Sequence, residues 1–160
     1  MKIKAKNLTF VASIASIYVV LTVLFAPISY GWIQFRVSEA LTILPFFTPL
    51  AIPGLTIGVL IANIFSQAGI PDMIFGPLAT LIAAIMTSKI KNKWLVPIPP
   101  ILVNAIIIGI MLGVLFSSEI SIPLAILWVG VGEFGVLYLL GMPLLLALEK
   151  RKDIFEKYND

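Results

Sequence analysis

Long apolar stretches, separated by short polar segments, run along almost the whole of this 160-residue chain. A helix crosses the ~30 Å hydrocarbon core of a bilayer with about 20 apolar residues, and several of these stretches approach that length. The pattern predicts six helices, of which the second is short and tilted. Their expected limits are residues 8–27, 38–48, 54–67, 72–89, 99–116 and 123–147.

The middle of the chain, residues 38–67, decides the number of helices. It is too long for one ordinary span and short for two, and prolines interrupt it. If the N-terminus and the lysines at 89–93 lie on one side of the membrane, the chain crosses an even number of times between them. We therefore predict two crossings here, joined by a proline-rich inner turn at 48–53. A re-entrant hairpin is the alternative, because broken helices are tolerated where protein buries them.

Composition agrees with this pattern. Hydrophobic residues make up 60% of the chain and charged residues 12%, with a mean hydropathy of +1.09, whereas about a quarter of a typical soluble domain is charged. We expect an all-α integral membrane protein with one transmembrane domain over residues 1–160. Because Cys and His are absent, disulfides, thiol chemistry, imidazole bases and Cys/His metal sites are excluded.

Enzymatic function is also disfavoured. The chain has no glycine-rich phosphate loop. A hydrolase in the bilayer would need a serine or aspartate pair, or a cluster of metal ligands, and neither is evident in the sequence. We therefore expect no enzyme activity, no catalytic residue, no metal and no cofactor.

Positive charge is concentrated where it orients the chain. The net charge is +3, and ten of the eleven basic residues lie in segments 2–6, 89–93 and 150–157, next to apolar stretches. Basic residues favour the cytoplasmic side of membrane proteins. We expect a multi-pass protein of the cell membrane with both termini cytoplasmic, and no binding to nucleic acid. The first apolar run is long for a signal peptide, so we interpret it as a retained span.

The eleventh basic residue, Arg36, lies in the polar segment Gln34–Leu41, around which we interpret the chain as organised. No other charge occurs between Lys6 and Arg36, or between Glu39 and Asp72. A charge at the centre of a membrane helix costs about 2.5–3.5 kcal/mol on insertion scales. Arg36 and Glu39 are three residues apart, so they share a helix face and can pair. We interpret them as the entrance to a polar site.

Glu133 is the second position at which a charge inside the membrane would be costly. It lies near the middle of the last helix, inside the glycine-rich segment Gly130–Gly135, with no other charge within ten residues. An ionisable residue inside the membrane usually marks a functional site. We favour a site, with glycines that admit a ligand or a close helix; a structural pair with Arg36 is the alternative.

Further polar residues extend the predicted site, each with an alternative interpretation. Asn63 and Gln67 are four apart and would share one face of their helix, whereas Asn104 is either a ligand contact or an interhelical hydrogen bond. Asp72 starts a small and polar stripe, but helix capping is the favoured role for it. Trp32 belongs to an aromatic loop that forms either an interfacial belt or a lid over a ligand.

Together these features predict six crossings and a polar set biased toward the outer half of the membrane. Such a set indicates a binding pocket that opens to the outside. A small proton-coupled transporter that uses Glu133 as its relay is the alternative. This alternative has less support, because the chain has one isolated carboxylate and shows no internal repeat of the kind common in secondary transporters.

Several stretches of the chain resemble the QueT-type family. The most specific are Gln34-Phe35-Arg36-Val37-Ser38-Glu39-Ala40 and Pro99-Pro100-Ile101-Leu102-Val103-Asn104. The resemblance extends from about residue 11 to 150 and includes Gly54-Leu55-Thr56-Ile57-Gly58 and Gly130-Val131-Gly132-Glu133. Members of this family are substrate-binding S components of energy-coupling factor (ECF) transporters, associated with queuosine precursors.

The resemblance implies a six-helix S-component fold and a set of partners. The protein would capture a vitamin-like solute outside the cell, then dock on a membrane coupling subunit driven by two cytoplasmic ATPases. S components often dock through an Ala-x-x-x-Ala pattern on the first helix, and the matching residues here are Ala12 and Ser16. Spacing alone favours ordinary packing inside the protein for this small-residue pair.

The implied ligand fits the polar residues chemically. A 7-deazaguanine offers a ring N–H and an exocyclic amine, which one carboxylate accepts through strong charge-assisted hydrogen bonds. We assign this role to Glu133 or Glu39, with Arg36 balancing the charge. The remaining contacts are expected from Gln34, Asn63, Gln67, Asn104 and Trp32. Other vitamins stay open as substrates, because pockets differ within one fold.

Overall fold

The structure, a computed structural model, describes residues 5–31 and 33–159 of the chain, and these ranges contain helices and no strand. Four helical segments are long and apolar enough to cross a membrane. They are Ala5–Leu24, Ile70–Thr87, Lys93–Leu115 and Ile122–Glu149. Two shorter apolar helices, Val37–Phe46 and Ala51–Phe65, lie between the first and second of them. The prediction of an all-helical, multi-pass membrane protein is therefore supported.

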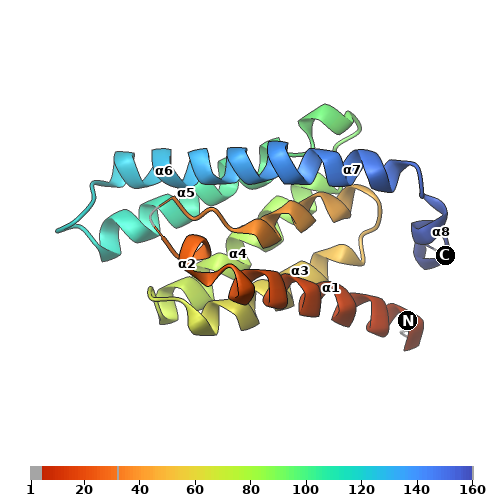
Figure 1. The fold of residues 1–160 in the computed structure, drawn as a ribbon, viewed down its shortest axis with the longest axis horizontal. Helices are drawn as coiled ribbons and strands as arrows, with labels where there is room; N and C mark the ends of the chain where they lie inside the picture. Colours follow the sequence, from red (N-terminus) through yellow and green to blue (C-terminus); the bar gives the residue numbers. More distant parts are fainter. Residues whose placement is uncertain (1–4, 32, 160) are drawn as a thin grey trace.

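The helical elements lie side by side along the long axis of the molecule and alternate in direction (Figure 1). Both termini lie at the same end. The elements and their bounds are α1 (Ala5–Leu24), α2 (Ala26–Ser29), η1 (Val37–Phe46), α3 (Ala51–Ala62), η2 (Asn63–Phe65), α4 (Ile70–Thr87), η3 (Lys93–Leu95), α5 (Ile98–Leu115), α6 (Ile122–Val136), η4 (Leu137–Gly141), α7 (Met142–Glu149) and α8 (Asp153–Asn159).

The short second helix is present, but it is a 3₁₀-helix. Element η1 spans ten residues from Val37 to Phe46. A 3₁₀-helix rises about 2.0 Å per residue and an α-helix about 1.5 Å, so ten residues reach about 20 Å instead of about 15 Å. The tighter winding lets a short segment reach deep into the bundle, where seven of its ten residues are buried.

Prolines explain two further departures from regular α-helix. Helix α1 ends at Leu24, before the predicted limit at Pro27, and the chain continues as the short helix α2. Proline lacks an amide hydrogen and its ring clashes with the carbonyl four residues earlier. Near Pro143 the last helix remains continuous but widens into the π-helical turn η4 between α6 and α7, a common way to relieve such a clash.

Glycines bring pairs of helices into close contact. A β-carbon on Gly109 of α5 would lie 2.6 Å from the Cα atom of Ile126, and one on Gly113 would lie 2.6 Å from that of Ile122. These glycines form a G-x-x-x-G pattern against α6, of the kind that lets membrane helices approach closely. On the other side of the bundle, Gly58 of α3 presses against α1 in a similar way.

Helix α1 turns the small-residue pair outward. Its buried positions are Ile14, Ala15, Tyr18 and Thr22, and Ala15 and Tyr18 contact Gly58. Ala12 and Ser16 are exposed. The interpretation of this pair as packing inside the protein is therefore wrong. The face of α1 that packs on the bundle is formed by the buried residues named above, and Ala12 and Ser16 lie outside it.

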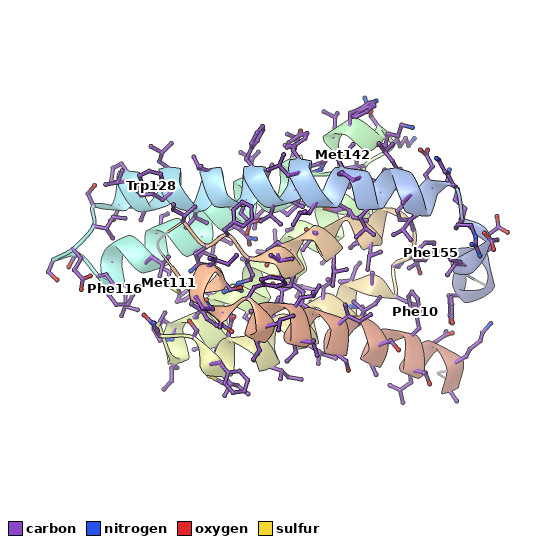
Figure 2. The ribbon with its side chains drawn as sticks, in the orientation of Figure 1. Phe10, Met111, Phe116, Trp128, Met142 and Phe155 are labelled. Carbon is purple, nitrogen blue, oxygen red and sulfur yellow. The ribbon has the colours of Figure 1, made fainter. Side chains whose placement is uncertain are left out.

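The end of the molecule that holds both termini also holds an ion pair between Lys93 and Glu149. Lys93 lies 2.7 Å from the carboxylate of Glu149. The C-terminal segment forms α8, which folds back onto α1: the rings of Phe10 and Phe155 meet edge to face at 6.3 Å (Figure 2). Large apolar side chains such as Leu8, Val20 and Leu127 are exposed on the long helices, as expected for surfaces that face lipid.

Replacing Gly109 with alanine is expected to lower the free energy of unfolding by about 1–3 kcal/mol, the usual cost of overpacking. The added carbon meets the backbone of Ile126, which cannot move aside cheaply. Thermal unfolding in detergent measures the loss. The matched control is Gly130→Ala on α6, whose added carbon would lie at an ordinary 3.5 Å from the Ala105 side chain. Equal stability of the two variants would contradict the proposed helix contact.

Candidate functional site

Among the residues that the structure describes, four charged side chains are buried inside the bundle. Arg36, Glu39, Asp72 and Glu133 are at most 5% exposed. They come from the start of η1, from η1 itself, from the first turn of α4 and from α6. The structure therefore brings the three charged residues predicted for the site into one interior, together with a fourth, Asp72.

Arg36 is held at the entrance of η1 by an unusual turn. The preceding Gln34 has a positive φ of 50°, which is uncommon for a residue with a side chain and often marks a functional site. The Arg36 amide donates to the Gln34 carbonyl at 2.7 Å. This turn directs the chain from the surface into the bundle, so that the Arg36 guanidinium is buried.

The partner of Arg36 is Asp72, at 3.7 Å between Nη2 and Oδ2. Arg36 does not form its ion pair with Glu39, the pairing that a spacing of three residues allowed and the sequence left open. The prediction that Asp72 caps its helix is wrong: α4 starts at Ile70 after Gly69, without a side-chain cap, and the Asp72 carboxylate is buried beside Arg36. The partner of the Asp72 carboxylate, Arg36, is 36 residues earlier in the chain, so local sequence around the helix start does not reveal it.

Glu39 is tied to α1 through a residue that the sequence analysis did not identify. The Tyr18 hydroxyl of α1 donates to Oε1 of Glu39. One helical turn further along, the Thr22 and Ser38 hydroxyls hydrogen-bond at 2.6 Å. Tyr18 and Thr22 are four residues apart and form a polar stripe within an apolar helix. This stripe is the feature of the sequence from which their role could have been predicted.

Glu133 is bonded across two helices. The Asn104 side-chain amide of α5 donates to its Oε1 at 2.8 Å. The alternative in which Glu133 forms a structural pair with Arg36 is not realised, because the described ion pair of Arg36 is with Asp72. Asn104 makes the interhelical hydrogen bond that was one of its two predicted roles, and its partner, Glu133, is itself a predicted site residue.

The glycines around Glu133 accommodate the chain itself. A β-carbon on Gly132 would collide with the Ile33 carbonyl oxygen, and one on Gly135 would lie 2.9 Å from the Phe35 ring. The segment before Arg36, including Phe35, therefore packs directly onto α6. This contact brings the buried Arg36 and the buried Glu133 into the same interior.

Asn63 and Gln67 do not share a face. Helix α3 ends at Ala62 and Ser66 is extended, so the four-residue spacing no longer corresponds to one helical turn. Asn63 is fully buried and donates to the Asp72 carbonyl at 2.8 Å. Gln67 is exposed, so only Asn63 belongs to the buried cluster.

A cavity of about 300 Å³ lies beside the cluster, and Gln34, Gln67 and Tyr30 help to line it. Tyr30 connects the cavity with the cluster, because it lines the cavity and its ring centre is 5.5 Å from the Arg36 guanidinium. The Tyr30 hydroxyl donates to the Ala62 carbonyl at 2.6 Å. Burial raises the pKa of the Tyr30 phenol, which keeps the hydroxyl a donor. The exposed Glu119 of the α5–α6 turn is also at this cavity. Trp32, the predicted stacking residue, lies outside the described residues.

Several buried polar atoms of the cluster have no hydrogen-bond partner among the described residues. They include Oε2 of Glu39, Oε2 of Glu133, Oδ1 of Asn63 and Nε of Arg36. Leaving a buried polar group unsatisfied costs about 1–3 kcal/mol, and more for a charged one. The arrangement is thus able to accept hydrogen bonds from a polar ligand at two carboxylates and to donate from a guanidinium.

Replacing Asp72 with asparagine is expected to destabilise the protein by about 3–5 kcal/mol, because it leaves the buried Arg36 charge without its partner. Thermal unfolding in detergent measures the effect. Glu119→Gln, at an exposed carboxylate on the same side of the molecule, is the control and should change stability by less than about 0.5 kcal/mol. The double variant Arg36→Met with Asp72→Leu should recover most of the loss; its failure to do so would argue against the ion pair as the cause.

The queuosine precursor transporter QueT of Lactococcus lactis subsp. cremoris (strain MG1363) is 42% identical to this chain over 83 residues, which cover 51% of this chain and 48% of that protein. The matched region thus spans about half the length of this curated relative. No solved structure matches the chain significantly. The QueT transporter family model matches residues 8–150, and the chain with this buried polar cluster therefore belongs to the QueT transporter family.

Proposed function

We propose that this protein is the substrate-binding membrane subunit of an ECF-type importer and that it captures a 7-deazaguanine queuosine precursor. Family membership supports the transport role, and the printed name of the Lactococcus relative supports the substrate class. The observation that carries the proposal is the pair of buried glutamates. Glu39 and Glu133 each have one oxygen bound by a protein donor and one without a partner.

The chemistry of the substrate matches these acceptors. A 7-deazaguanine presents a ring N–H and an exocyclic amine side by side, and a carboxylate is the acceptor that takes both with charge-assisted bonds. In a site without water these bonds gain strength, because the dielectric is low. Arg36 is available to donate to the ring carbonyl. Asn63, Gln34 and Gln67 would contact the ligand along its path from the cavity.

We place the cavity on the outer side of the membrane. Both termini lie at the opposite end (Figure 1), Lys93 pairs there with Glu149 of α7, and basic residues favour the cytoplasm. The elements α1, η1, α3, α4, α5 and α6–α7 would then make six crossings within a single domain. In this orientation a solute enters from outside through the cavity beside Gln34 and Tyr30.

The exposed face of α1 is the proposed docking surface for the coupling subunit, which two cytoplasmic ATPases would drive. Ala12 and Ser16 are exposed on it, and small residues let a second helix approach closely. The substrate would be released inward when the docked subunit reorients in the membrane.

Ligand-dependent thermal stabilisation of the purified protein in detergent tests the binding role. At one hundred times its dissociation constant, a specific ligand should stabilise the protein by ~2.7 kcal/mol. We expect this shift with 7-deazaguanines and none with riboflavin, thiamine or biotin. A stability shift with one of those vitamins would agree with the transport role but would identify that vitamin, instead of a 7-deazaguanine, as the substrate. No shift with any ligand, for a folded sample, would favour the proton-coupled transporter instead.

In the same assay Glu133→Gln should weaken the best-bound 7-deazaguanine by at least ~1.5 kcal/mol, the low end for hydrogen bonds to charged groups. The matched control is Glu149→Gln, which changes a carboxylate at the C-terminal end of the same continuous helix. An unchanged affinity in the Glu133 variant would remove this residue from the site.

Replacing Ser16 with tryptophan should abolish uptake while leaving ligand affinity within about twofold, because the bulky ring blocks helix approach on a face remote from the buried carboxylates. Uptake in cells and binding in detergent are measured on the same variant. Leu127→Trp, at a 58% exposed position on α6, is the control and should leave both unchanged. Unimpaired uptake with Ser16→Trp would reject this docking surface.

A further inference from the structure

The connection between α4 and α5, residues 88–97, carries positive charge only. In the stretch from residue 73 to residue 118 the charged residues are Lys89, Lys91 and Lys93, and all three lie in this connection. Lys93 is engaged by the carboxylate of Glu149 at 2.7 Å. Lys89 and Lys91 are exposed, and neither has an ion-pair partner among the described residues. Two ammonium groups are therefore available to an anion from outside the protein.

The same connection exposes large apolar side chains next to these lysines. Trp94 is 57% exposed and Leu95 is 49% exposed. An exposed indole beside basic residues is typical of the interface between lipid tails and headgroups, where the ring is buried and its N–H remains solvated. The combination of free lysines with exposed apolar side chains therefore fits a surface that contacts lipid better than one that contacts water alone.

The connection is fixed beside the bundle. It projects sideways from the bundle next to α7 (Figure 1). The Asn92 side chain accepts a hydrogen bond from the Trp94 amide at 3.1 Å and starts η3. Val96 is fully buried, and the ion pair of Lys93 with Glu149 ties the connection to α7. The free lysines and the indole are thus presented together on the side of the molecule that faces the membrane.

We propose that residues 88–97 form a binding site for the headgroup of an anionic phospholipid. Lys89 and Lys91 neutralise the headgroup, while Trp94 and Leu95 contact the start of the acyl chains. A lysine side chain suits this position, because its stem stays in apolar surroundings while its ammonium group reaches the headgroup layer. The site is at the end of the molecule that holds both termini, away from the cavity beside Gln34, so it does not depend on the proposed substrate.

The exposed apolar pair selects a lipid over a soluble anion. Free phosphate would use the two ammonium groups but would leave Trp94 and Leu95 in water. Each lysine or arginine near the membrane surface raises the affinity for anionic lipid by about fivefold. Two free lysines therefore predict a preference of about five- to thirtyfold for an anionic lipid over a zwitterionic one.

The test compares two lipids that share their acyl chains, dioleoylphosphatidylglycerol and dioleoylphosphatidylcholine. Native mass spectrometry of the full-length protein in detergent gives the dissociation constant of each protein–lipid complex. We expect the wild type to bind phosphatidylglycerol about five- to thirtyfold more tightly. Equal binding of the two lipids overturns the proposal. Inorganic phosphate alone should not stabilise the protein against thermal unfolding, and stabilisation by phosphate would replace the lipid with a soluble anion.

Two double variants with the same change in charge locate the site. Lys89→Gln with Lys91→Gln should reduce the preference for phosphatidylglycerol to less than about twofold. Lys150→Gln with Arg151→Gln, at exposed positions after α7, should keep the preference. Unfolding temperatures in phosphatidylcholine equal to that of the wild type show that both variants fold. An undiminished preference in the first variant, or an equal loss in both, overturns the proposal, and the equal loss would indicate an effect of overall positive charge.

Two further measurements separate the parts of the site and the kind of partner. Trp94→Ala should weaken both lipids by a similar factor and keep the preference, because it removes apolar contact and no charge. A loss of preference in Trp94→Ala would contradict the proposed division of roles. If the variant of Lys89 and Lys91 binds both lipids as the wild type does but fails in uptake, the surface belongs to a protein partner and the lipid site is rejected.

Discussion

The burial of Arg36 is the constraint on which the rest of this structure depends. A guanidinium in an apolar bundle requires an opposite charge nearby, and Asp72 supplies it at 3.7 Å. To bring these two residues together, the chain must enter the bundle directly after α2, through the positive-φ turn at Gln34. It must also press against α6, where only glycine leaves room for the Ile33 carbonyl. The unusual η1 helix follows from that entry.

The same constraint places the two glutamates. Because η1 runs inward from Arg36, Glu39 lies one turn deeper and meets the Tyr18 hydroxyl of α1. Because residues 33–35 lie on α6, Glu133 faces the same interior, where Asn104 holds it. The elements α1, η1, α4, α5 and α6 thus contribute to one polar cluster, and each of them would lose a hydrogen-bond or ion-pair partner if the cluster came apart.

The cluster is incompletely satisfied, and this feature points to a ligand. Native proteins pair nearly all buried polar groups, and a folded protein tolerates exceptions where a substrate will complete them. Helix α1 has a second role in this account, because its inner face holds Tyr18 and its outer face exposes Ala12 and Ser16. One rigid helix therefore connects the proposed ligand site with the proposed docking surface.

The sequence by itself determined the class of protein, the helical segments, including a short second one, and three of the four charged residues that are buried in the described part of the bundle. Those features follow from hydrophobic length and from the cost of a charge in lipid, which are local properties. Tertiary structure alone decided which residues are partners. Asp72 pairs with Arg36, Tyr18 bonds to Glu39, and Gln67 lies outside the cluster, because each outcome depends on where separate helices meet. A spacing of three residues allowed Arg36 to pair with Glu39, but the contact of its segment with α4 gave it Asp72 instead.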